Sequence, residues 1–338
     1  MFTFPMANYA STALSSASVL GMAMQGTPYM QFYSITSGVY TAYAAPGTTP
    51  TGQCFACAIN NIGTLTSIGS NSSPYLLNYS ISGSILTKLS DPGTLPSGAT
   101  NAVAYNPNGS FLAAGCNMTP YLLIYSISGA TFTKIANPST IPSNTVNSLA
   151  FSPDGNFLAV GTTGTPFLTI YSISGSTFTV VAGQPSSIPA TQITSIAFNT
   201  TSTFMAITMT ISPYIAIYSI SGTTFTRLSN PSSIPTAAAH SISFSPDGNF
   251  LAVGYNATPY IIIYSISGST FTKLSNPNTL PGGGGNGVAF NAASTLLTVA
   301  ADGSPYILTY SINGNTFTAL SNPSTLPQLS GASAAYYN

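Results

Sequence analysis

Hydrophobic residues in this chain form short runs that proline, glycine, serine and asparagine interrupt at regular intervals. Residues 146–151 form an apolar segment, a Ser-Pro-Asp-Gly sequence follows, and residues 156–161 form a second segment. A proline then precedes the run 167–173, and a Ser-Gly pair separates that run from residues 176–181. Runs of this length, rich in β-branched and aromatic residues and bounded by turn residues, predict four antiparallel strands.

This four-strand unit occurs seven times. Its proline recurs every 46 residues, with one step of 47, at Pro28, Pro74, Pro120, Pro166, Pro213, Pro259 and Pro305. A period of about 40 to 50 residues with four strands per unit is typical of propeller blades. We therefore predict an all-β fold: one seven-bladed β-propeller of four-stranded antiparallel blades, with almost no helix.

The repeat also predicts where each blade begins and ends within a single domain, 1–338. Residues 333–338 align with 286–291, the first strand of a blade, so the C-terminal strand is expected to enter blade 1 and close the ring. Blade 1 then takes about 11–50 plus 333–338. The other blades are expected at about 52–96, 98–142, 144–189, 191–235, 237–281 and 284–327.

The third strand of each unit is apolar on both faces, as in 260–266 (YIIIYSI). Such a strand must be covered on both sides, which propeller blades achieve by stacking around an axis. Tyrosine recurs in this strand in every unit. A residue type that recurs at one slot favours packing between blades over stacking on a sugar. The tyrosines concerned are Tyr33, Tyr79, Tyr125, Tyr171, Tyr218, Tyr264 and Tyr310.

Charge is almost absent from this chain, which has four Lys or Arg, four Asp or Glu and zero net charge. Phosphate binding needs clustered cations, so nucleic acid is not expected as a partner. No apolar run approaches the roughly 18 residues of a membrane span. The four cations fall 14 residues after the repeat proline, on the predicted outer strand, where charge discourages pairing between sheets. They are Lys88, Lys134, Arg227 and Lys273.

Candidate chemistry is sparse. Cys54 and Cys57 form a C-x-x-C without a second pair, and on a regular strand their side chains would face opposite ways. Cys57 and Cys116 are therefore expected to be small core residues. His240 is the only histidine and is expected on a loop or rim. Asp154 and its equivalents read as turn formers. We therefore predict no catalytic residue, no metal and no cofactor, and hence no enzyme.

Several motifs resemble known families. Ser152-Pro-Asp-Gly155 and Ser245-Pro-Asp-Gly248, each followed by Asn-Phe-Leu-Ala-Val, resemble WD-repeat-type and YVTN-type seven-bladed propellers. The longer phrase Thr258–Pro277 (TPYIIIYSISGSTFTKLSNP) is similar to repeats in proteins of tailed bacteriophages. The phage resemblance implies a structural protein. The YVTN resemblance also includes lactonase-like enzymes.

The functional prediction follows from that resemblance and from the neutral composition. It is a non-catalytic virion protein of a tailed phage: a head decoration, a tail-associated protein or a host-adhesion module. Its partners would be other virion proteins, copies of itself or a host surface glycan, with no membrane partner. The expected contacts are Phe2, Phe4 and Tyr9 in the spare N-terminal segment. The alternatives are a microbial cell-surface or filament subunit and, more remotely, a lactonase-like enzyme.

Overall fold

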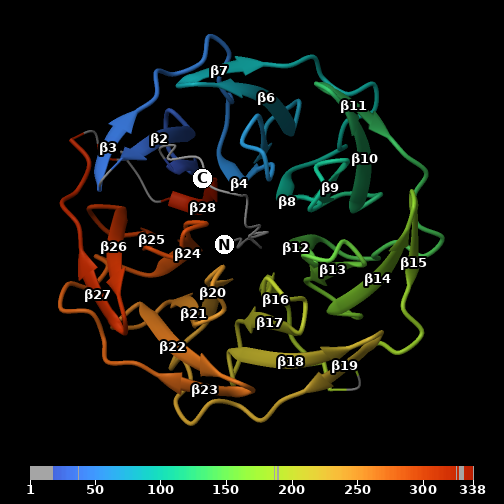
Figure 1. Ribbon diagram of the computed structural model, residues 1–338. Coiled ribbons are helices and arrows are strands. Elements are labelled where there is room, and N and C mark those ends of the chain that lie inside the picture. The colour runs from blue at the N-terminus through green and yellow to red at the C-terminus, as the bar shows by residue number, and fades with distance from the viewer. Residues whose placement is uncertain are drawn as a thin grey trace.

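The computed structural model describes residues 18–36, 38–185, 187–188, 190–324, 326 and 331–337. These residues form seven antiparallel sheets of four strands each, placed around a central axis (Figure 1). No helix occurs among them, and none that could cross a membrane. The prediction of an all-β, seven-bladed propeller is confirmed.

The strands take four radial positions. The innermost are β4 (Cys54–Ile59), β8 (Thr100–Tyr105), β12 (Val146–Phe151), β16 (Ile193–Phe198), β20 (Ala239–Phe244), β24 (Gly285–Phe290) and β28 (Gly331–Tyr337). The second are β1 (Ser18–Met24), β5 (Leu65–Ser70), β9 (Phe111–Cys116), β13 (Phe157–Thr162), β17 (Phe204–Met209), β21 (Phe250–Tyr255) and β25 (Leu296–Ala301). The third are β2 (Met30–Thr36), β6 (Leu76–Ser82), β10 (Leu122–Ser128), β14 (Leu168–Ser174), β18 (Ile215–Ser221), β22 (Ile261–Ser267) and β26 (Ile307–Asn313). The outermost are β3 (Val39–Ala42), β7 (Ile85–Lys88), β11 (Thr131–Lys134), β15 (Thr177–Val180), β19 (Thr224–Arg227), β23 (Thr270–Lys273) and β27 (Thr316–Ala319).

The C-terminal strand closes the ring, as predicted. β28 pairs antiparallel with β1, with Leu20 opposite Tyr336. It also lies beside the innermost strands β24 and β4 of the two neighbouring blades. The last segment of the chain therefore completes the blade that its first described strand begins (Figure 1).

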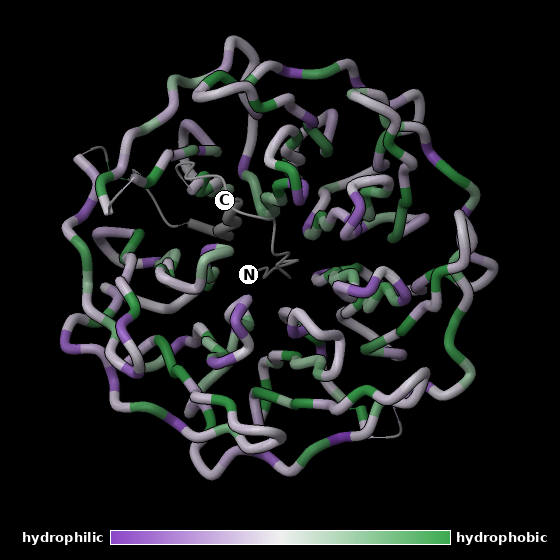
Figure 2. Tube along the Cα trace, viewed as in Figure 1, coloured by the Kyte–Doolittle hydropathy of each residue, from purple (hydrophilic) through white to green (hydrophobic). Residues whose placement is uncertain are grey.

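The hydrophobic core lies between the blades. Leu122 and Ile124 of blade 3 belong to one buried cluster with Val146 and Leu149 of blade 4. Hydrophobic stretches recur in every blade around the ring (Figure 2). Glycine in the second strand permits this close approach, because an added Cβ at Gly115 would overlap the Val146 side chain. Burial on both faces, predicted for the third strands from their apolar sequence, is confirmed.

The third-strand tyrosines also hold the blades together. Their side chains are fully buried. The hydroxyl of Tyr171 donates to the backbone carbonyl of Thr140, in the segment that connects blades 3 and 4, at 2.9 Å. The same bond recurs from Tyr79, Tyr125, Tyr218, Tyr264 and Tyr310, each to the residue 31 positions earlier. The predicted packing role of these tyrosines is confirmed. Their hydroxyls also form hydrogen bonds that the sequence did not predict.

Each innermost strand carries a β-bulge near its start. In blade 4, Val146 pairs with Thr162 and Ser148 with Gly161, so Asn147 is the extra residue. The same shift occurs in all seven sheets. A bulge inserts one residue that the ladder leaves unpaired. The seven bulge residues are Phe55, Asn101, Asn147, Thr194, His240, Asn286 and Ala332.

The bulge corrects the expectation for the C-x-x-C pair. In blade 4 the residues on both sides of the bulge, Val146 and Leu149, approach the same glycine, Gly115, and so share a face. Cys54 and Cys57 occupy the equivalent positions in blade 2 and belong to one buried cluster. The predicted opposite orientation is therefore wrong, because a bulge interrupts the two-residue alternation. Burial raises the pKa of both thiols to about 12.

Candidate functional site

Five of the seven bulge residues are polar, and they lie on consecutive innermost strands, β8 to β24. They are Asn101, Asn147, Thr194, His240 and Asn286, each at most 3% exposed. The innermost strands lie around the central axis, each beside the next (Figure 1). The bulge lies near the start of each strand, which places these residues in a ring around one end of the axis. We call these five residues the bulge ring.

Most of the bulge ring has polar atoms without protein partners. Both amide atoms of Asn101, both ring nitrogens of His240 and the amide oxygens of Asn147 and Asn286 accept or donate no hydrogen bond among the described residues. The hydroxyls of Ser148 and Ser241 share this property. A buried polar atom without a partner costs about 1 to 3 kcal/mol, so proteins rarely retain several together. Their gathering in one place points to a ligand or to bound water.

Thr194 is the exception within the ring. Its hydroxyl donates to the carbonyl of Ala239 in the next blade, at 2.6 Å, and approaches the Thr208 hydroxyl at 2.9 Å. This bond shows that a bulge residue can reach the neighbouring innermost strand. The other four polar members make no such bond.

His240 lies within strand β20 and is 3% exposed. The prediction of a loop or rim histidine is therefore wrong, because β20 already begins at Ala239 and His240 is the bulge residue of this strand. Burial lowers the pKa of His240 to about 4, and the Asn256 side chain partly opposes this shift. The imidazole is thus neutral at pH 7, and burial disfavours its protonated form.

The glycine run 282–285 lies between residues of blades 6 and 7. The backbone N–H of Asn256 donates to the carbonyl of Ala238, and the N–H of Asp302 donates to the carbonyl of Gly284. An added Cβ at Gly284 would overlap Asn256 Oδ1 and would lie 3.1 Å from Asp302 Oδ2. Because residue 284 is a glycine, the side chains of Asn256 and Asp302 can both lie close to its α-carbon.

The four cations lie elsewhere. All are on outermost strands, as predicted, and three of them bind the corner that follows their own strand. Lys88 forms an ion pair with Asp91 at 2.5 Å. Lys134 donates to Asn137 Oδ1 at 2.5 Å, and Arg227 donates to Asn230 Oδ1 at 2.8 Å. These cations therefore fix the connecting segments of the ring and do not form a basic site.

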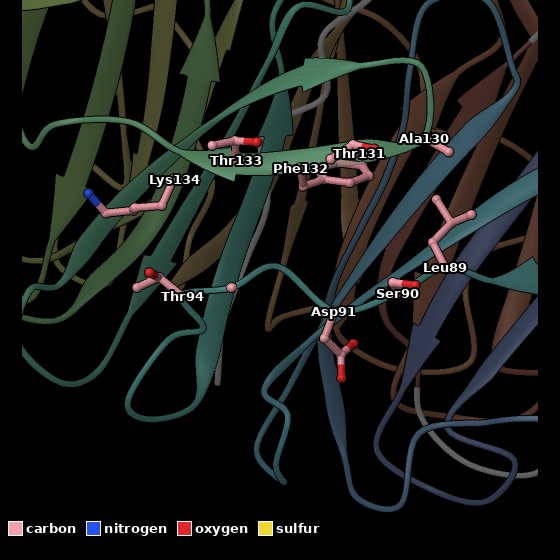
Figure 3. Close-up of a pocket in the computed structure, with 10 residues that line it drawn as sticks. Leu89, Ser90, Asp91, Thr94, Ala130, Thr131, Phe132, Thr133 and Lys134 are labelled. Carbon is pink, nitrogen blue, oxygen red and sulfur yellow. The ribbon is translucent and has the colours of Figure 1, made fainter.

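An outer pocket with a volume of about 490 Å³ lies between blades 2 and 3. Residues 89–91, 93–94 and 130–134 line it, and Lys134 is among them. Figure 3 shows the Lys134 amine and the Asp91 carboxylate pointing away from one another. Since each is bound to a partner on its own segment, the two do not form an acid–base pair.

The aspartates of the first turns are also engaged. Asp154 Oδ1 accepts hydrogen bonds from the Ser152 hydroxyl at 2.5 Å and the Asn156 backbone N–H at 3.1 Å. Asp247 repeats these contacts with Ser245 and Asn249. The prediction that these residues are turn formers is confirmed. Among the described residues, no group of three or more His, Cys, Asp or Glu is placed to hold a metal ion.

The sequence-predicted contact residues Phe2, Phe4 and Tyr9 lie outside the described residues. Cys57 and Cys116 are buried core residues, as predicted. The bulge ring was missed by the sequence analysis. Its signal is present in the repeat: a polar residue stands at this slot in five consecutive units, within first strands that are otherwise rich in small and apolar residues.

Known proteins resemble this chain mainly in fold. A WD40 (WD domain, G-beta repeat) family model matches residues 138–165. No curated protein matches the chain by sequence. A candidate 6-phosphogluconolactonase from Bacteroides fragilis matches with a TM-score of 0.77 at 13% identity, covering 98% of this chain and 100% of that chain.

Two further solved structures match over the whole ring. A candidate 6-phosphogluconolactonase from Bacteroides uniformis has a TM-score of 0.76 at 13% identity, covering 96% of this chain and 100% of that chain. The periplasmic gluconolactonase of Pseudomonas aeruginosa has a TM-score of 0.72 at 12% identity, covering 96% of this chain and 99% of that chain. The TM-scores show a shared propeller fold, and at 12–13% identity they show the fold alone.

These matches overturn the functional prediction. The expected virion protein without catalytic activity finds no counterpart in them, whereas three of the matched propellers carry lactonase names. The predictions of a non-enzyme and of a phage or cell-surface structural role are therefore corrected. The resemblance of the repeat phrase to phage proteins reflected shared strand and turn sequences, which specify a blade and not its use.

Proposed function

We propose that this protein is a lactonase-type propeller that hydrolyses a sugar-derived lactone at the bulge ring. One observation carries the proposal: the buried imidazole of His240 lies on an innermost strand with both ring nitrogens unpartnered among the described residues. The lactonase names of the matched propellers support the reaction class.

The proposed reaction needs a base that is neutral at the working pH. His240 meets this condition, because burial lowers its pKa to about 4 and keeps the imidazole neutral. A pKa this low also makes the imidazole a weaker base than a solvent-exposed histidine, so the proton transfer must be concerted with attack of the water. The imidazole accepts a proton from water as the water oxygen forms a bond to the lactone carbonyl carbon. The ring C–O bond then breaks, and the proton passes to the departing ring oxygen. A well-placed general base of this kind contributes about 10²- to 10⁴-fold in rate.

Charge develops on the carbonyl oxygen during this step. Asn286, the bulge residue of the next innermost strand, carries a side-chain amide, and amide N–H groups are suitable donors to such an oxygen. Neutral donors serve this purpose without a cation. The reaction consumes one water and releases the open-chain hydroxy acid, so atoms and charge balance.

The test is a hydrolysis assay on the full chain with D-glucono-1,5-lactone, corrected for spontaneous hydrolysis. His240→Asn is the informative variant, because asparagine occupies the same slot at Asn101, Asn147 and Asn286 and is compatible with the bulge. We expect its rate to fall at least about 100-fold. Lys273→Ala is the matched control, in the same blade but on the outermost strand, where blade 7 carries Ala319.

Two results would refute the proposal. One is a wild-type rate that does not exceed spontaneous hydrolysis for either five- or six-membered sugar lactones. The other is a His240→Asn variant that hydrolyses the lactone as fast as wild type. Lys273→Ala should keep the wild-type rate.

A further inference from the structure

The seven bulge positions hold polar residues, the bulge ring, on five consecutive innermost strands and apolar residues on the other two. Asn101 and Asn147 lie on β8 and β12, and His240 and Asn286 lie on β20 and β24. Between these pairs stands Thr194, whose hydroxyl is already bound to Ala239. The remaining two bulge positions hold Phe55 and Ala332. The unpartnered polar atoms are thus divided into two groups, one on each side of Thr194.

The group on β8 and β12 is separate from the proposed catalytic histidine. It comprises both amide atoms of Asn101, the amide oxygen of Asn147 and the hydroxyl of Ser148, all unpartnered among the described residues. Asn101 is 0% exposed and Asn147 2%. We call these three residues the amide subsite. A carboxamide both donates and accepts, which matches a sugar hydroxyl that also does both.

Neither group contains a charge of the kind that would bind an anion. All four Lys and Arg side chains lie on the outermost strands β7, β11, β19 and β23. A phosphate transferred from water to the bulge ring would lose its hydration without gaining a cation, which is costly. The chemistry of the bulge ring therefore favours an uncharged ligand.

Building on the proposed function, we infer that the substrate is an uncharged, unphosphorylated polyhydroxy lactone. The amide subsite binds hydroxyls in the part of the substrate remote from the carbonyl, and Asn101 and Asn147 act as positioning residues. This assignment separates the protein from the phosphorylated substrate that the names of two matched propellers state.

The experiment measures binding apart from hydrolysis. The probe is 1,5-anhydro-D-glucitol, a neutral polyhydroxy ring without a carbonyl, compared with its 6-phosphate by calorimetric titration of the full chain. We expect the neutral ring to bind and the phosphate to bind at least about tenfold more weakly. Asn101→Leu and Asn147→Leu should each weaken the neutral ring by roughly three- to tenfold, the size of one lost neutral hydrogen bond.

Asn137→Leu is the matched control, because Asn137 is an exposed amide on the outer corner of blade 3. It should bind the neutral ring as wild type does. Should a leucine variant not fold, Asn147→Thr replaces it, because Thr194 shows that threonine fits the slot. Equal or tighter binding of the 6-phosphate, no binding of the neutral ring, or wild-type binding by both amide variants would overturn the inference.

The outcomes also distinguish this inference from the proposed function. Binding of the neutral ring without lactone hydrolysis would refute the lactonase and leave the amide subsite standing. Lactone hydrolysis that depends on His240 but favours the 6-phospho lactone would leave the lactonase standing and refute the uncharged substrate.

Discussion

The third strand and the innermost strand of each blade follow the same repeat, but they vary in different ways. The third strand keeps its tyrosine in all seven blades, and among the described residues the hydroxyl bond to the preceding connection recurs in six of them. The innermost strand keeps its bulge in every blade, yet the bulge residue changes among Phe, Asn, Thr, His and Ala. Constant slots therefore build the ring, and the slot at the bulge, which varies, is where we propose the chemistry.

Loss of the C-terminal strand that closes the ring should have the largest effect on stability. Deletion of residues 331–338 removes the ladder between β28 and β1 and exposes the inner faces of the neighbouring blades. We expect the free energy of unfolding to fall by about 5 kcal/mol or more, since both backbone pairing and apolar burial are lost. Urea unfolding followed by circular dichroism measures this, and an unchanged midpoint would contradict the closure described above.

His240, at the bulge position of blade 6, should instead make the stability of the fold depend on pH. The pKa of His240 is lowered to about 4 in the folded chain, below the ordinary value of 6.5. Its neutral form is favoured by folding, so this contribution is fully present above pH 6.5 and is lost as the pH falls toward 4. The loss should reach about 3 kcal/mol at and below pH 4.

Thermal unfolding between pH 7 and pH 4 measures this contribution. The stability of the His240→Asn variant should fall much less over that range, because asparagine does not titrate. If the variant and the wild type lost stability in parallel, the acid sensitivity would come from other groups and the burial argument for His240 would fail.

Removing the hydroxyl of one third-strand tyrosine should lower stability moderately and leave the rate of lactone hydrolysis unchanged. Tyr171→Phe removes the hydroxyl that donates to Thr140 and leaves the buried ring in place. We expect a loss of about 1 kcal/mol in the free energy of unfolding. Tyr125→Phe should behave alike, because Tyr125 makes the same bond to Thr94. A lowered rate of lactone hydrolysis in either variant would contradict the claim that these tyrosines act only in packing the blades.

The outer corners should matter least. Asp91→Asn replaces the carboxylate that pairs with Lys88 by the residue that other blades carry, as at Asn137 and Asn230. We expect the free energy of unfolding to change by less than about 0.5 kcal/mol, because exposed ion pairs contribute little. Chemical denaturation at low and at high salt tests this. A loss of more than about 1 kcal/mol in the free energy of unfolding would show that the ion pair between Lys88 and Asp91 stabilises the fold.

Much of this molecule could be predicted from the sequence alone. The fixed proline and tyrosine positions specify seven blades, because each apolar run is bounded by turn residues at a constant spacing. The alignment of the C-terminal segment with first strands predicted the closure that β28 makes. Local patterns sufficed here because hydrophobic alternation and turn chemistry act over a few residues.

Tertiary structure decided the site. Asn101, Asn147, His240 and Asn286 are separated by tens of residues, and only the closed ring places their strands around one axis. The bulge beside each of them interrupts the strand alternation, so neither the shared face of Cys54 and Cys57 nor the burial of His240 follows from a regular strand. A sequence records which side chains are polar, but whether a polar atom finds a partner depends on what the neighbouring blade presents to it.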